Sequence, residues 1–173
     1  MAEQLHPDAD ADPEDGRSET RTERLDRNWN QLLQELRVLQ TGTQLLTGFL
    51  LTVAFQSTFR DLADWQRLLY LVVVSVAVLS TTVALMPVAL HRALFRRRAM
   101  ADLVAWGDRM LRIGLVCTGV TIVGVVALVF GEVAGPAGAA AAGAVGVVLT
   151  LLLWLALPAR VRRGTESPHG RST

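Results

Sequence analysis

Four long apolar stretches constrain this chain more than any other feature of its sequence. They cover residues 36–58, 67–90, 111–131 and 136–158. An α-helix rises about 1.5 Å per residue, so about 20 residues are enough to cross a hydrocarbon core of about 30 Å. Each stretch reaches that length. The sequence therefore predicts an all-α, polytopic membrane protein with four transmembrane helices.

The arginines predict how these helices are oriented. All 17 basic residues are arginine. Only Arg60 and Arg67 lie at the junction of the first two stretches, and none lies in the short turn before the fourth. The remaining arginines gather at the opposite ends of the stretches, and basic segments stay on the cytoplasmic side of a membrane. We therefore expect both termini and the middle loop to be cytoplasmic.

The two ends of the chain differ from its apolar middle. Residues 1–19 are rich in carboxylates and contain almost no large apolar side chain. Such a segment cannot offset its loss of conformational entropy by burial. We therefore predict a disordered acidic tail at 1–20, a transmembrane domain at 21–160 and a disordered basic tail at 161–173.

An amphipathic helix is expected to precede the first span. Thr20 and Glu23 have the spacing of a capping box, which predicts a helix that begins near Arg21. Apolar residues then recur at steps of four and three, namely Leu25, Trp29, Leu32, Leu36 and Leu39. This stripe has two interpretations: a helix that lies on the inner leaflet, or a short coiled-coil or partner-binding helix.

The first span is more polar than a membrane span needs to be. One face of its helical wheel carries Arg37, Gln40, Thr41, Gln44, Thr47 and Thr52. Polar groups that face lipid lose hydrogen bonds at a cost of several kcal/mol each, so we expect this face to contact another helix or a water-filled cavity. Three interpretations stay open: hydrogen bonds between helices, a pathway for an ion or small solute, and a pocket for a lipid or ligand headgroup.

Titratable groups lie only at the edges of the predicted spans. Glu35 and His91 are the candidates, and histidine titrates near neutral pH. The alternative for His91 is an ordinary interfacial residue. We also expect anionic lipid headgroups to bind the arginines of the middle loop, which are Arg92, Arg96, Arg97 and Arg98.

Two local patterns predict how the third and fourth spans begin and pack. Gly107 predicts a break between a cytoplasmic helix in the middle loop and the third span, where Asp108 and Arg112 have favourable i,i+4 spacing. Small residues recur at four-residue steps in the fourth span, at Gly138, Ala142 and Gly146. Such steps allow helices to approach closely, either in a tight bundle or in a homodimer.

The sequence contains none of the patterns on which enzymes depend. The three histidines are far apart, and no glycine-rich phosphate loop, nucleophile–base pair or carboxylate dyad is present. We therefore predict no catalytic residues, no metal site, no cofactor and no nucleic-acid partner. The expected partners are membrane lipids and either a second copy of the chain or another membrane protein.

Two segments carry a resemblance to a known family. RNWNQLLQELRVLQTGTQLLTGFLLTVAFQ (Arg27–Gln56), followed by MPVALHRALFR (Met86–Arg96), resembles small bacterial four-span membrane proteins of unknown function. The resemblance extends over about residues 25–160. It implies a location in the bacterial inner membrane, and some members of the family are automatically labelled sodium:proton antiporters.

The distribution of carboxylates argues against antiport. Exchange of a cation for a proton ordinarily needs an ionisable carboxylate at membrane depth. No Asp or Glu lies between Arg37 and Asp61, between Arg67 and His91, or between Arg112 and Glu132. We therefore expect a structural, accessory or interaction protein. The alternative is a small secondary transporter that uses the polar face of the first span.

Overall fold

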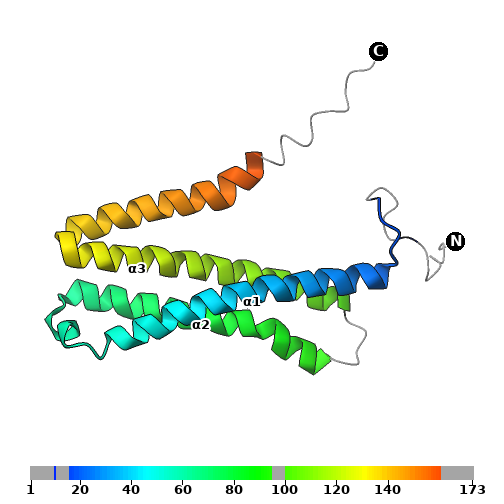
Figure 1. Cartoon of the computed structure of the whole chain (residues 1–173), viewed down its shortest axis with the longest axis horizontal. Helices are drawn as coiled ribbons and strands as arrows, with labels where there is room; N and C mark the ends of the chain where they lie inside the picture. Colours follow the sequence, from blue (N-terminus) through cyan, green and yellow to red (C-terminus); the bar gives the residue numbers. More distant parts are fainter. Residues whose placement is uncertain (1–9, 11–15, 95–99, 161–173) are drawn as a thin grey trace, which may run out of the picture. The chain divides into compact units, whose positions relative to one another are not determined.

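A computed structural model describes residue 10 and residues 16–94 and 100–160. Most of the predicted N-terminal tail and all of the predicted C-terminal tail lie outside these residues, as do Arg96, Arg97 and Arg98. The described elements are α1 (Arg21–Val53), the short 3-10 helix η1 (Ser57–Asp61), α2 (Asp64–Leu94), α3 (Met100–Leu151) and the π-helical turn η2 (Leu152–Ala156) (Figure 1). These segments are helical, which confirms the all-α prediction.

The capping box at the start of α1 is confirmed. The backbone N–H and the hydroxyl of Thr20 each donate a hydrogen bond of 2.8 Å to the carboxylate of Glu23. The backbone N–H of Glu23 donates in return to the hydroxyl of Thr20, at 3.3 Å. Arg27 reaches back from the second turn and forms an ion pair with Glu19. The helix therefore begins at Arg21, as predicted.

The chain forms two compact units, and each of the three long helices contributes to both. The first unit consists of Met1–Phe49 and Ala77–Cys117. The second consists of Leu50–Val76 and Thr118–Thr173. Each unit has its own packing.

The apolar stripe of α1 forms the core of the first unit. Trp29, Leu32, Leu36 and Leu39 are buried together with Ala84 of α2 and with Leu103 and Leu111 of α3. The helix is thus amphipathic, as expected. Its apolar side, however, contacts the protein's own helices rather than a leaflet or a partner, which corrects both interpretations of the stripe. The reason is that α2 and α3 supply a complementary apolar surface within the same unit.

Gly107 does not break the helix, contrary to the prediction. α3 runs through it without interruption from Met100, so the expected cytoplasmic helix and the third span are one helix. Gly107 is buried, and a Cβ at this position would lie 3.0 Å from the Leu32 side chain. Its role is therefore to let α1 and α3 approach closely. Asp108 and Arg112 form the expected i,i+4 ion pair.

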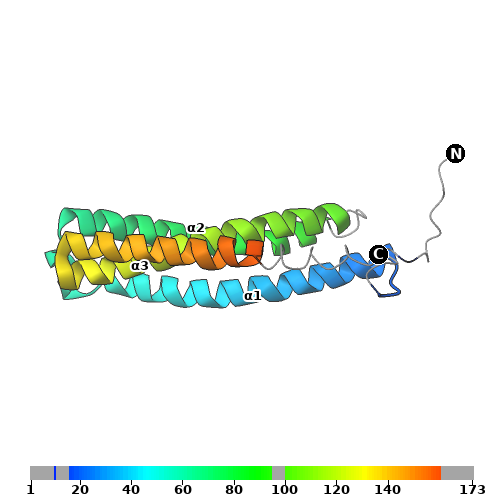
Figure 2. The same ribbon diagram turned by 90° about the horizontal axis from the view of Figure 1, so that it is seen from above.

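In the second unit, α3 reverses direction at Gly135. The φ of Gly135 is +70° and its ψ is −169°, a conformation that side chains with a Cβ rarely adopt. Pro136 follows at the start of the returning helix, where its missing N–H causes no loss. The two arms lie side by side in Figures 1 and 2, in which the returning arm runs from yellow to orange.

Small residues hold the two arms of this hairpin together. A Cβ at Gly146 would lie 3.2 Å from a methyl group of Val123, and a Cβ at Gly119 would lie 3.2 Å from the ring of Trp154. The close approach predicted from the spacing in the fourth stretch is thus present at Gly146, within the chain itself.

Two helical segments are long and apolar enough to cross a membrane. They are Asp64–Arg92 and Ala101–Arg160, and their most apolar 18-residue windows have mean hydropathies of 2.4 and 2.6. Large apolar side chains are exposed along both, among them Leu68, Val116 and Leu155. Extended apolar surface of this kind is typical of contact with lipid or with another protein. The more polar α1 ends at Val53, five residues before the end of the first apolar stretch.

The packing predicts a sharp difference between two glycines. Gly124 is buried, and a Cβ there would overlap the branched side chain of Val73, so Gly124→Ala should lower the free energy of unfolding by about 1–3 kcal/mol. Gly42 is in a helix with open space around it. Gly42→Ala should leave stability unchanged or raise it by up to about 1 kcal/mol. Equilibrium unfolding in a mild detergent measures both, and equal effects would contradict this packing.

The start of α1 should depend on pH. Hydrogen bonds from Thr20 hold the pKa of Glu23 below its ordinary 4.5, and the bond from Arg27 lowers the pKa of Glu19 in the same way. Because the folded pKa lies below the unfolded one, the stabilisation is fully present above pH 4.5 and is lost as the pH falls through the folded value. Amide protection factors in the first turn should therefore fall on acidification.

The control for this prediction is Thr20→Ala, which removes the cap itself. It should lower protection in the first turn already at neutral pH, by an amount equivalent to about 1 kcal/mol. Protection factors that stay constant on acidification in the unaltered chain would show that these carboxylates do not hold the helix start.

Candidate functional site

The polar face that the sequence predicts for the first apolar stretch lies on the outer surface of the first unit. Six residues of α1 that share this face are all exposed, and we call them the α1 polar stripe: Asn30, Gln34, Arg37, Thr41, Gln44 and Gly48. At about 100° per residue they lie opposite the buried residues Leu36, Leu39 and Thr43. The direction of the stripe is therefore set by the core on the other side of the same helix.

The structure places the remaining predicted residues of this face at its border or along its continuation. Gln40 and Thr47 are half-buried beside the stripe, and Thr52 is exposed one turn further along α1. The prediction was that this face contacts another helix or a cavity. Within the described chain its central residues do neither, because they are exposed.

Some of the polarity of the stripe is satisfied inside α1. The hydroxyl of Thr41 donates to the backbone carbonyl of Arg37 at 2.9 Å, and the Arg37 guanidinium donates to the amide oxygen of Gln34 at 3.4 Å. The Gln44 amide has no described partner of this kind. Val38 and Phe49 flank the stripe and are 76% and 66% exposed. The result is a polar seam within an apolar helix surface, which is an arrangement suited to contact with another membrane helix.

The two predicted titratable groups have different surroundings. The ring of His91 stacks on that of Trp29, with centroids 5.5 Å apart and an angle of 16° between the planes. His91 therefore belongs to the border of the first unit's core, whereas Glu35 is exposed on α1. Arg92 is exposed near the end of α2. Nothing in the spacing along the sequence pointed to the stack of His91 on Trp29.

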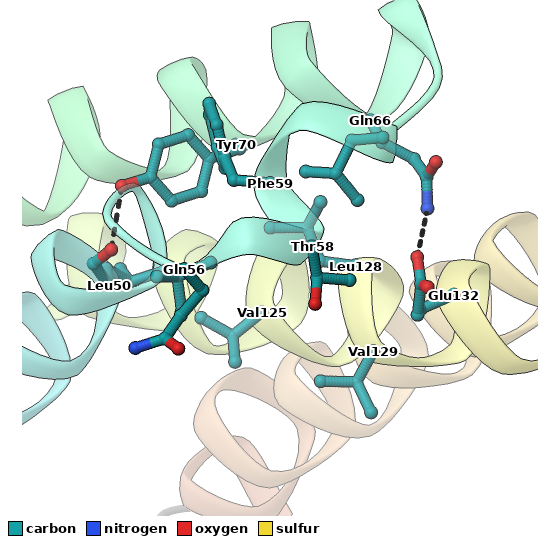
Figure 3. Close-up of a pocket in the computed structure, with 12 residues that line it drawn as sticks. Leu50, Gln56, Thr58, Phe59, Gln66, Tyr70, Val125, Leu128, Val129 and Glu132 are labelled. Atoms are coloured by element: carbon teal, nitrogen blue, oxygen red, sulfur yellow. Dashed lines mark hydrogen bonds between the residues drawn. The ribbon is translucent and has the colours of Figure 1, made fainter.

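The second unit contains a pocket that the sequence did not predict. It has a volume of about 320 Å³ and lies among the end of α1, η1, the start of α2 and the third apolar stretch (Figure 3). Its walls are mostly apolar, and they include Leu50, Val125 and Leu128. Its lining residues come from two segments that are far apart in the sequence, 50–70 and 125–132, so no local pattern could have revealed it.

An aromatic pair holds one side of this pocket. The hydroxyl of Tyr70 donates a hydrogen bond of 2.7 Å to the backbone carbonyl of Leu50. The same ring meets Phe59 edge to face, with centroids 4.9 Å apart. These contacts fasten the end of α1 and the helix η1 to α2 beside the pocket.

Gln66 holds the polar end of the pocket. This side chain is only 7% exposed. Its amide oxygen accepts a hydrogen bond of 2.9 Å from the backbone N–H of Ala63, and its amide nitrogen donates one of 3.0 Å to the carboxylate of Glu132. Gln66 thus caps α2 and fixes Glu132 at the same time. Among the described residues, no cluster of three or more His, Cys, Asp or Glu could hold a metal ion.

Comparison with known proteins identifies the family of the chain but no function. The model of the family of unknown function DUF6328 matches residues 18–158, which is most of the sequence, and the chain belongs to that family. No curated protein matches the chain significantly, and no solved structure does.

Proposed function

We propose that this DUF6328 protein is a four-span accessory protein of the bacterial inner membrane that acts through contact between the α1 polar stripe and another transmembrane helix. The observation that carries the proposal is the exposure of Gln44 and its neighbours on the outside of α1. A surface with such amides needs a hydrogen-bonding partner in a hydrocarbon environment.

Helix lengths support four crossings. At about 1.5 Å per residue, the segment Ala101–Arg160 would extend about 90 Å as one rod, about three times the thickness of a hydrocarbon core. The reversal at Gly135 divides it into two arms that each match one crossing. The 33 residues of α1 correspond to about 50 Å, enough for one crossing with a cytoplasmic extension. The arginine distribution then favours cytoplasmic termini.

The charge in the stripe is compatible with this arrangement. Arg37 is on the cytoplasmic side of the proposed first crossing, and its long side chain can extend towards the headgroups. Thr41, Gln44 and Gly48 lie deeper. A helix from a second copy of the chain or from another membrane protein would cover them, supply hydrogen bonds and exclude lipid.

The transporter alternative needs the same assembly. A polar pathway must be enclosed, whereas the stripe of a single chain is open to its surroundings. Only a second helix against the stripe would enclose it. We therefore place helix contact first and transport second, and the proposal includes no catalysis.

Substitutions of two matched threonines and of one glutamine test whether the α1 polar stripe contacts another helix. The hydroxyls of Thr41 and Thr82 both donate at 2.9 Å to a carbonyl four residues earlier, and both side chains are exposed, but only Thr41 lies on the stripe. Thr41→Val combined with Gln44→Leu should weaken association in a lipid bilayer by about tenfold, since each hydrogen bond between membrane helices contributes about 0.6 kcal/mol and close packing is also lost. Thr82→Val should have no effect.

Association is measured by single-molecule photobleaching in supported bilayers, first with the chain alone and then in native membrane vesicles. Loss of association only in the stripe variant supports the proposal. Association of the chain alone would indicate self-association, and association only in native membrane vesicles would indicate a partner protein. An unaltered chain that associates neither with a second copy nor with another protein in either preparation would refute it.

Ion flux tests the transporter alternative. A folded protein that only makes contacts should leave proton and sodium gradients unchanged in proteoliposomes. A saturable, cation-dependent collapse of a pH gradient that disappears in Glu35→Gln and His91→Ala would instead establish transport through the edge groups.

A further inference from the structure

The pocket of the second unit has the composition of a binding site for a small amphiphile. Its volume of about 320 Å³ lies at the lower end of the range of about 300–1,000 Å³ that is typical of small-molecule sites. Such sites combine apolar walls with a few fixed polar groups. Here the apolar walls are provided by α1, α2 and α3, and the polar end is provided by Gln66 and Glu132 (Figure 3).

The polar end of the pocket carries only negative charge. Glu132 is the only charged residue among those that line the pocket, all of which the structure describes. Its described hydrogen bond comes from Gln66 and involves one carboxylate oxygen, Oε2. A carboxylate has two oxygens and several acceptor positions, so Glu132 retains an oxygen that can pair with a cation. Anionic amphiphiles are disfavoured at this end by repulsion.

The polar end is also rigid. Both polar atoms of the Gln66 amide form hydrogen bonds, the oxygen with the backbone N–H of Ala63 and the nitrogen with the carboxylate of Glu132. The carboxylate is therefore held beside the apolar cavity before any ligand arrives. Such preorganisation reduces the entropy that a bound head would otherwise lose.

We propose that this pocket binds an amphiphile whose ammonium head pairs with Glu132 and whose apolar part fills the cavity between Leu50, Tyr70 and Val125. The source of the ammonium is either a membrane lipid or a soluble alkylammonium compound. The site is separate in sequence and chemistry from the α1 polar stripe, so this inference does not rest on the proposed function.

Two variants separate the roles of charge and cavity. Glu132→Gln keeps an oxygen acceptor for Gln66 but removes the negative charge. Val129→Trp fills the pocket from a lining position that is 57% exposed, where a larger side chain is readily accommodated. Asp64→Asn is the matched control, since it makes the same carboxylate-to-amide change at an exposed residue of the same unit that does not line the pocket.

The measurement is native mass spectrometry of the full chain released from maltoside micelles, with unfolding curves to verify that each variant is folded. The probes are decyltrimethylammonium, decanol, phosphatidylethanolamine and phosphatidylglycerol. We expect one decyltrimethylammonium bound per chain in preference to decanol. Binding should be about fivefold weaker in Glu132→Gln, absent in Val129→Trp and unchanged in Asp64→Asn.

The two phospholipid probes identify the source of the ammonium head. Retention of phosphatidylethanolamine over phosphatidylglycerol, with the same response to the variants, would indicate a lipid ligand. Retention of the alkylammonium alone would indicate a soluble one. Equal retention of decanol and decyltrimethylammonium, or unchanged binding in a folded Glu132→Gln or Val129→Trp variant, would overturn the proposal.

Discussion

The close approach of α1 and α3 at two glycines determines how the first unit is arranged. A Cβ at Gly107 would lie 3.0 Å from Leu32, and one at Gly114 would lie 2.7 Å from Leu39, so these leucines fill the space that the missing side chains leave. The buried hydroxyl of Ser80 adds a hydrogen bond of 3.0 Å to the carbonyl of Gly114 and ties α2 to the same contact. Glycine without a Cβ is what lets three helices bury one apolar stripe.

This contact also decides what α1 presents outward. A helix has 3.6 residues per turn, so burying Leu32, Leu36 and Leu39 on one side necessarily turns Arg37, Thr41 and Gln44 away from the core. α1 thus carries an apolar stripe and a polar stripe on opposite sides, and the first unit can bury only one of them. The apolar stripe is buried, and the polar stripe stays exposed.

The sequence predicted the features that depend on neighbouring residues. The start of α1 followed from Thr20 and Glu23, and the ion pair of α3 followed from the spacing of Asp108 and Arg112. The choice of the buried stripe could not be predicted in the same way, because a membrane protein can bury polar residues and expose apolar ones. Gly107 was misread for a related reason: a glycine that breaks a helix and one that packs against a leucine have the same sequence context.

The candidate sites show how differently the same amide group acts in two surroundings. Gln66 is buried and both ends of its amide are hydrogen-bonded within the chain, so it stabilises structure and positions Glu132. Gln44 is exposed on α1, at a depth where the proposed crossing leaves no water to satisfy it. Both glutamines lie in helices, but Gln66 is in the first turn of α2 between Trp65 and Arg67, whereas Gln44 lies within α1 between Thr43 and Leu45. The neighbouring helices bury Gln66 and leave Gln44 exposed, so the proposed contact with another helix would supply the hydrogen bonds that the described chain does not give to Gln44.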